Sequence, residues 1–198
     1  MLTSSNVLVA GVSSAGKSTF IANHLMPEMT SAGRRHHVYF AGQLMRQYNL
    51  RGELVGPAPP FSLARSGVSI VHLNLLMPRE DDLATFSQAL MAWATDYDVY
   101  LCYAPDAVIR ARIANRTKVE PRLSGDASPY PAEQFQERFS DVDQRQMLLT
   151  FGEAIAPAAR SRTIVFSNDR TTSHLTWDDF LYARPSPALE AALTQRPD

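Results

Sequence analysis

Cysteine is almost absent from this chain of 198 residues, in which Cys102 is the only one. No disulfide can therefore form within the chain, and no zinc site built from cysteines is available. Neither sign of charge is in excess, because 19 basic residues face 20 acidic ones and the formal net charge is -1. This balance excludes nucleic-acid binding through bulk positive charge, and it excludes a disordered acidic chain.

Long apolar runs are also missing. No stretch approaches the ~18 consecutive apolar residues that a membrane-spanning helix requires. The first residues, Met1 to Asn6, lack the charged start and the apolar core of a secretory signal. We therefore expect a soluble, cytoplasmic protein with no membrane partner. Lysine is scarce too, but one of the two lysines, Lys17, belongs to the clearest motif of the chain.

Residues 11 to 18 read Gly-Val-Ser-Ser-Ala-Gly-Lys-Ser, which fits the pattern G-x-x-x-x-G-K-[ST]. An apolar run of strand type, 6–10, precedes the motif, and a helical pattern follows it and is expected to end at Pro27. The glycines allow backbone N–H groups to turn toward a phosphate, Lys17 can reach the β- and γ-phosphates, and the Ser18 hydroxyl can ligate Mg²⁺. The expected phosphate-binding residues are Gly11, Ser13, Ser14, Ala15, Gly16, Lys17, Ser18 and Thr19.

This motif resembles the Walker A loop of the P-loop NTPases. The bland alternative is a Gly/Ser-rich turn that carries an exposed lysine, and the flanking strand and helix argue against it.

Strand-like and helix-like segments alternate along the rest of the chain, as a parallel α/β sheet requires. The further strands are expected at 37–41, 69–76, 98–103 and 163–166, and the further helices at 82–95, 105–116, 132–159 and 177–182. This order predicts an α/β fold, a three-layer α/β/α sandwich with a mainly parallel five-stranded sheet. A single domain is expected over 1–184, with a loosely attached tail over 185–198. In such sheets, ligands bind beyond the carboxyl ends of the strands.

The chain as a whole resembles the small P-loop kinases, the group of the adenylate, shikimate and gluconate kinases. A basic cluster supports this resemblance: Arg110, Arg112 and Arg116 on the helix after the fourth strand, then Lys118 and Arg122 in a Pro/Gly-rich stretch over 117–131. The resemblance implies a lid that closes over ATP at this place, whose Arg112 and Arg116 stabilise charge on the transferring phosphoryl group. It also implies that Arg116 contacts the nucleotide. A solvated basic helix face is the alternative.

The segment after the fifth strand begins Ser-Asn-Asp-Arg, and its position resembles the loop that contacts adenine in these kinases. The resemblance thus implies nucleotide binding by Asn168. A loop rich in Ser, Asn, Asp and Thr also forms for purely local reasons.

The sequence departs from these kinases in its carboxylates. Many of them carry an acid after the second strand, where this chain has Ala-Gly-Gln43, and the third strand offers His72 and Asn74 in place of a Walker B acid. The catalytic base therefore stays open. Asp81 or Asp82 is preferred, then His72, for which a hydrogen-bonded core histidine is the alternative interpretation.

The acceptor is expected between the ends of the second and third strands, beneath a turn-rich excursion over 50–67. Arg46, Arg51 and Arg65 in this region suit a small anionic acceptor, but they suit a solvated loop equally well. The candidate substrate-binding residues are Gln43, Arg46, Arg65, His72, Asn74 and Arg122.

Together these features predict an ATP-dependent kinase that transfers the γ-phosphoryl group, with ATP and Mg²⁺, to a hydroxyl or phosphate of a small molecule. A sulfotransferase-like protein that uses a sulfonated nucleotide is one alternative. Another is a non-kinase P-loop NTPase that acts through a protein partner, although the third strand is followed by Leu-Met-Pro and not by the Asp-x-x-Gly of a GTPase. A third alternative is a degenerate fold without catalytic activity. The sequence does not indicate the oligomeric state.

Overall fold

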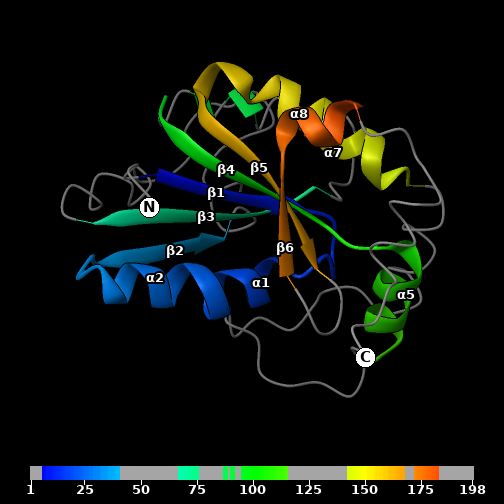
Figure 1. Cartoon of the computed structure of the whole chain (residues 1–198), viewed down its shortest axis with the longest axis horizontal. Helices are drawn as coiled ribbons and strands as arrows, with labels where there is room; N and C mark the ends of the chain where they lie inside the picture. The colour runs from blue at the N-terminus through cyan, green and yellow to red at the C-terminus, as the bar shows by residue number, and fades with distance from the viewer. Residues whose placement is uncertain are drawn as a thin grey trace, which may run out of the picture.

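A computed structural model describes residues 6–40, 67–75, 87–88, 90–91, 95–115, 142–167 and 172–182. Its centre is a six-stranded sheet with the strand order β2-β3-β1-β4-β5-β6 (Figure 1). The strands are β1 (Asn6–Gly11), β2 (His36–Phe40), β3 (Val68–Asn74), β4 (Tyr97–Tyr103), β5 (Ala159–Ser167) and β6 (Thr172–Thr176). All neighbouring pairs are parallel except β5 and β6, which are antiparallel.

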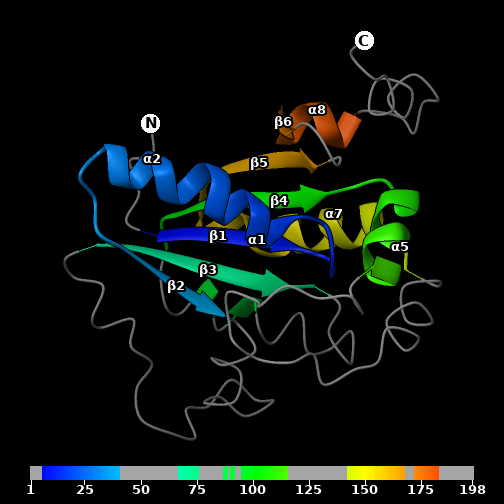
Figure 2. The same ribbon diagram turned by 90° about the horizontal axis from the view of Figure 1, so that it is seen from below.

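Helices cover both faces of this sheet, so the predicted three-layer α/β/α arrangement is confirmed (Figures 1 and 2). One face carries a continuous helical segment made of α1 (Lys17–Phe20), the π-helix η1 (Ile21–Leu25) and α2 (Met26–Ser31), together with α5 (Asp106–Asn115). The other face carries α7 (Gln144–Ala154), the short 3₁₀ helix η4 (Ala156–Ala158) and α8 (Trp177–Tyr182).

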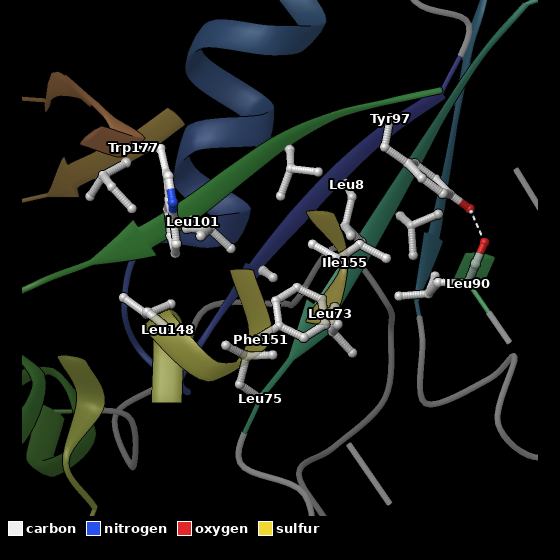
Figure 3. Packing of buried hydrophobic residues seen from close by; sticks show 14 of the residues in the cluster. Leu8, Leu73, Leu75, Leu90, Tyr97, Leu101, Leu148, Phe151, Ile155 and Trp177 are labelled. Atoms are coloured by element: carbon white, nitrogen blue, oxygen red, sulfur yellow. Dashed lines mark hydrogen bonds between the residues drawn. The ribbon is translucent and has the colours of Figure 1, made fainter. Parts of the chain in front are cut away.

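Two apolar cores follow from the alternation of side chains along the strands. Beneath α7 and α8, Leu8, Leu101, Phe151 and neighbouring side chains are fully buried (Figure 3). In the same core the hydroxyl of Tyr97 donates a hydrogen bond to the Leu90 carbonyl oxygen, 3.1 Å away. The opposite core joins α1, η1, α2 and α5 to the other face of the sheet. Because β1 contributes to both cores, its position in the centre of the sheet is fixed from two sides.

The prediction of five strands was wrong by one, because β6 had been interpreted as loop. Its sequence, Thr-Ser-His-Leu-Thr, is mostly polar and contains one aliphatic residue. Such a segment is typical of an edge strand, whose ladder hydrogen bonds come from a single neighbour, and its sequence alone resembles a loop. The strand before it, β5, begins at Ala159 and not at 163, so the predicted helix over 132–159 was too long at its end.

The prediction that the first helix stops at Pro27 was also wrong. The helical segment runs on to Ser31, and Pro27 lies in the first turn of α2. Directly before it, the N–H of Met26 donates to the carbonyl of Ile21, a π-type hydrogen bond that skips one residue more than an α-helix does. This wider turn precedes a residue that cannot donate a helical hydrogen bond itself, so the proline does not end the helix.

The remaining predicted elements agree within a few residues. The described part of the predicted helix over 82–95 is helical at Ser87, Gln88, Leu90 and Met91, and α8 has the predicted bounds. The excursion up to residue 66, the lid-like stretch 117–131 and the tail over 185–198 lie outside the described residues. Within the part of the chain that the structure describes, no helix is long and apolar enough to cross a membrane.

Candidate phosphate-binding site

The motif over residues 11–18, here named the 11–18 loop, leaves the sheet at the carboxyl end of its central strand. Gly11 is the last residue of β1, and its neighbours in the sheet are Asn74 of β3 and Cys102 of β4. A Cβ atom at Gly11 would lie 2.6 Å from the carbonyl oxygen of Cys102. Glycine is therefore required here by the close approach of the β4 backbone, and this approach fixes where the loop starts.

The 11–18 loop contains two residues with left-handed backbone conformations, Ser14 at a φ of 67° and Gly16 at a φ of 93°. A serine adopts this conformation at a cost of about 1–2 kcal/mol, so the loop holds it against a local preference. The Ser14 hydroxyl oxygen is buried and makes no hydrogen bond within the described structure. Alternating right- and left-handed residues turn successive N–H groups toward one side, which is the backbone geometry of anion-binding loops.

Lys17 is folded back onto the loop that precedes it. Its side chain is buried, and its ammonium nitrogen Nζ donates to the carbonyl oxygens of Gly11 at 2.8 Å and of Val12 at 2.6 Å. The positive charge therefore lies directly beside the loop backbone and does not extend into solvent. The interpretation of this segment as a turn with an exposed lysine is thus wrong.

The end of β3 holds the other side of the 11–18 loop. The Leu75 N–H donates to the Gly11 carbonyl oxygen at 3.0 Å, and Asn74 Nδ2 donates to Ser13 Oγ at 3.0 Å. Asn74 thus contacts the loop itself. In addition, the imidazole nitrogen Nε2 of His72 lies 3.3 Å from Ser18 Oγ.

A basic side chain reaches the loop from α5. Arg112 Nη1 donates to the Ser14 carbonyl oxygen at 3.0 Å, although the two residues are 98 positions apart in sequence. The fold therefore brings the guanidinium group of Arg112 and the ammonium group of Lys17 to the same loop. In this structure Arg112 contacts the loop backbone, so it supports the conformation of Ser14.

One supporting residue carries no signal in the sequence. Gln144, the first residue of α7, is buried, and its amide pairs with both backbone groups of Ala104. Nε2 donates to the Ala104 carbonyl oxygen at 2.8 Å, and Oε1 accepts from the Ala104 N–H at 3.2 Å. Ala104 lies directly between β4 and α5, so Gln144 fixes the segment that leads to Arg112. A glutamine in a polar run gives no hint of this role, because its partner is backbone.

The structure therefore brings part of the predicted site together. The predicted residues that lie in the 11–18 loop or contact it are Gly11, Ser13, Ser14, Ala15, Gly16, Lys17, Ser18, His72, Asn74 and Arg112. Thr19 follows the loop and is exposed. The predicted residues outside the described part of the chain are Gln43, Arg46, Arg65, Asp81, Asp82, Arg116, Arg122 and Asn168.

A metal ion at this loop would find an oxygen donor in Ser18 and an adjacent nitrogen donor in His72. Over the described ranges, no three His, Cys, Asp or Glu side chains are grouped as a metal site. The donors of Ser18 and His72 thus fit an ion whose remaining ligands come from the phosphates of a nucleotide or from water. They do not fit a cage made of protein ligands alone.

Two acidic groups near the centre of the sheet are held in their neutral forms. Burial raises the pKa of the Cys102 thiol to about 12, although the charge of Lys17 acts in the opposite direction. Burial, with the negative charges of Asp98 and Glu28, raises the pKa of Tyr100 to about 12. Cys102 is therefore an inert core residue and not a nucleophile, because the reactive form of cysteine is the thiolate.

The sequence matches no protein-family model and no curated protein.

Proposed function

We propose that this protein binds a nucleoside triphosphate at the 11–18 loop and transfers its γ-phosphoryl group to a small molecule. The observation that carries the proposal is the convergence of Lys17 and Arg112 on one loop at the carboxyl ends of parallel strands. Phosphoryl transfer depends mainly on positioning the phosphates and stabilising their negative charge. Two cationic side chains at one loop can contribute to both effects.

Each group has a distinct task in the proposed reaction. The N–H groups of the loop and the Ser14 hydroxyl hold the phosphates in place. Lys17 exchanges its contact with the Gly11 or the Val12 carbonyl oxygen for one with a phosphate oxygen, which is a small movement because Nζ already lies at the loop. Arg112, anchored at Ser14, adds positive charge on the α5 side. A bound Mg²⁺ ion would neutralise further charge on the phosphates.

ATP is the expected nucleotide, and the expected acceptor is a small molecule. The proposal places the acceptor near the ends of β2 and β3, since ligands of open α/β sheets gather beyond the carboxyl ends of their strands.

The first experiment is a thermal-shift series with ATP, GTP and a sulfonated nucleotide, each with and without Mg²⁺. A ligand that binds only the folded state raises the melting temperature, and the rise grows with ligand concentration. We expect a magnesium-dependent rise with ATP, followed by ADP release when acceptor candidates are added. A rise with the sulfonated nucleotide alone contradicts the kinase proposal and supports a sulfotransferase. No rise with any of the three contradicts nucleotide binding altogether.

Arg112 allows a second test with a matched control. Replacing Arg112 by alanine removes a charge at the loop, whereas Arg35→Ala removes the same charge from an exposed position before β2. We expect Arg112→Ala to lower kcat/KM by roughly 10- to 100-fold, in line with a loss of about 1.4–2.7 kcal/mol of transition-state stabilisation. Arg35→Ala is expected to leave it unchanged. Equal effects of the two variants contradict a specific role for Arg112.

A further inference from the structure

The contact between Ser18 and His72 places an imidazole beside the 11–18 loop. Ser18 is the residue whose hydroxyl is expected to ligate the metal ion, and the side chain of β3 that contacts this hydroxyl is an imidazole. A histidine at this position offers a nitrogen ligand, where a carboxylate would offer oxygen.

The geometry of the pair suits two ligands of one ion. His72 Nε2 and Ser18 Oγ are 3.3 Å apart. Two ligands that each lie about 2.1 Å from a metal ion, at an octahedral or tetrahedral angle, are about 3.0–3.4 Å apart. An ion bound between these two atoms would therefore replace their mutual contact without a large movement of either side chain.

The neighbouring strand holds the imidazole in this orientation. Phe40 of β2 pairs with His72 across the β2–β3 ladder, and their ring centroids are 5.1 Å apart. The ring of His72 is half-buried, with Ser18 at its Nε2 atom and Phe40 beside it. These contacts restrict the orientation of the imidazole, as a preorganised metal site requires.

We propose that His72 is an inner-sphere nitrogen ligand of the cation at Ser18, so that this protein uses divalent first-row transition metal ions better than Mg²⁺. Imidazole is a favourable ligand for transition metals, whereas Mg²⁺ favours oxygen ligands and usually keeps its waters. Affinity for such sites rises from Mn²⁺ to Co²⁺. This inference rests on the proposed binding of nucleotide at the 11–18 loop.

Electron spin-echo spectroscopy of the full-length protein with Mn²⁺ and ADP tests the coordination directly. We expect a ¹⁴N coupling from a bound imidazole, which changes to the ¹⁵N pattern when the protein is labelled with ¹⁵N-histidine. The label distinguishes imidazole from nitrogen atoms of the nucleotide, and this arm needs no variant. The coupling should disappear in His72→Ala and persist in His37→Ala, which removes an exposed histidine at the far end of the neighbouring strand.

Calorimetry provides the second readout. The ratio of the dissociation constants for Mg·ADP and Co·ADP is measured with wild type and with His72→Asp, which replaces nitrogen by oxygen. Comparing the ratio between the two proteins cancels the different affinities of the metals for ADP itself. We expect the preference for Co²⁺ to fall about tenfold in His72→Asp.

The outcomes separate this inference from the proposed function. Binding of Mn·ADP without a histidine coupling, or an unchanged metal ratio in His72→Asp, overturns the role of His72 and leaves nucleotide binding intact. If ADP binds with none of the metal ions, the proposed function itself fails, and this inference fails with it.

Discussion

The glycine that ends β1 offers the most quantitative test of how the 11–18 loop is positioned. In Gly11→Ala the new Cβ would lie 2.6 Å from the Cys102 carbonyl oxygen and 3.2 Å from the Cys102 Cβ. Ordinary contact requires at least about 3.4 Å, so β1 and β4 must separate by roughly 0.8 Å at this point. The obstructing atom belongs to a backbone in the centre of the sheet, and it cannot turn away as a side chain can.

The expected loss of folding free energy in Gly11→Ala follows from this geometry. Inserting a methyl group into a packed interior costs about 1–3 kcal/mol, and the upper end applies here because the neighbour is backbone. The matched control is Gly33→Ala after α2, where φ is 67° and no atom lies within 4 Å of the new Cβ. That variant carries only the strain of a left-handed alanine, about 1 kcal/mol.

Urea denaturation followed by tryptophan fluorescence, to which the buried Trp177 contributes, measures both variants. We expect Gly11→Ala to lower the free energy of unfolding by about 2 kcal/mol more than Gly33→Ala. Gly11→Ala should also weaken nucleotide binding, since the loop begins at this residue. Equal destabilisation by the two variants would refute the argument that β4 excludes a side chain at this position.

Three further predictions concern stability, pH and the site. Replacing Gln144 by leucine removes the side-chain partners of the buried N–H and carbonyl of Ala104. We expect this variant to lower the free energy of unfolding, measured by urea denaturation, by about 2–4 kcal/mol. A decrease below about 0.5 kcal/mol would contradict the supporting role of Gln144. Because the folded-state pKa values of Cys102 and Tyr100 are about 12, above their ordinary values of 9.0 and 10.0, the unfolded chain loses these protons first. Stability should therefore fall as the pH rises above about 9, by up to about 1.4 kcal/mol per pH unit and group, and a free energy of unfolding that is constant from pH 8 to 11 would contradict this. Iodoacetamide at pH 8 should not modify Cys102 in the folded protein, and mass spectrometry that finds rapid modification would show that the thiol is accessible.

The sequence was sufficient to predict the elements that bury apolar side chains in a regular pattern. The central strands consist of apolar runs, and the described structure places each of them within a few residues of its predicted position. The edge strand β6 was missed because its polar sequence does not differ from that of a loop. Pro27 misled the helix prediction, because the π-type turn before it depends on the backbone of the preceding residues and not on a recognisable motif.

In the candidate site, too, one part could be predicted from the sequence and another could not. The 11–18 loop was recognisable because its chemistry depends on residues that are adjacent in sequence. The contacts of Ser18 with His72 and of Ser14 with Arg112 join residues that are 54 and 98 positions apart. Such pairs depend on strand order and on the packing of α5, and no local sequence pattern predicts either. The amide of Gln144 was missed for the same reason, since its partners are backbone groups 40 positions away.

The central claim is that the 11–18 loop binds the phosphates of a nucleotide through Lys17. Isothermal titration calorimetry of ATP with a divalent metal ion tests it most directly, with wild type, Lys17→Met and the surface control Arg35→Ala. Methionine keeps the buried stem of the side chain and removes the charge. We expect wild type and Arg35→Ala to bind alike, and Lys17→Met to bind at least about 100-fold more weakly while remaining folded by circular dichroism. Unchanged ATP affinity in Lys17→Met, or no binding by the wild type, would contradict the account.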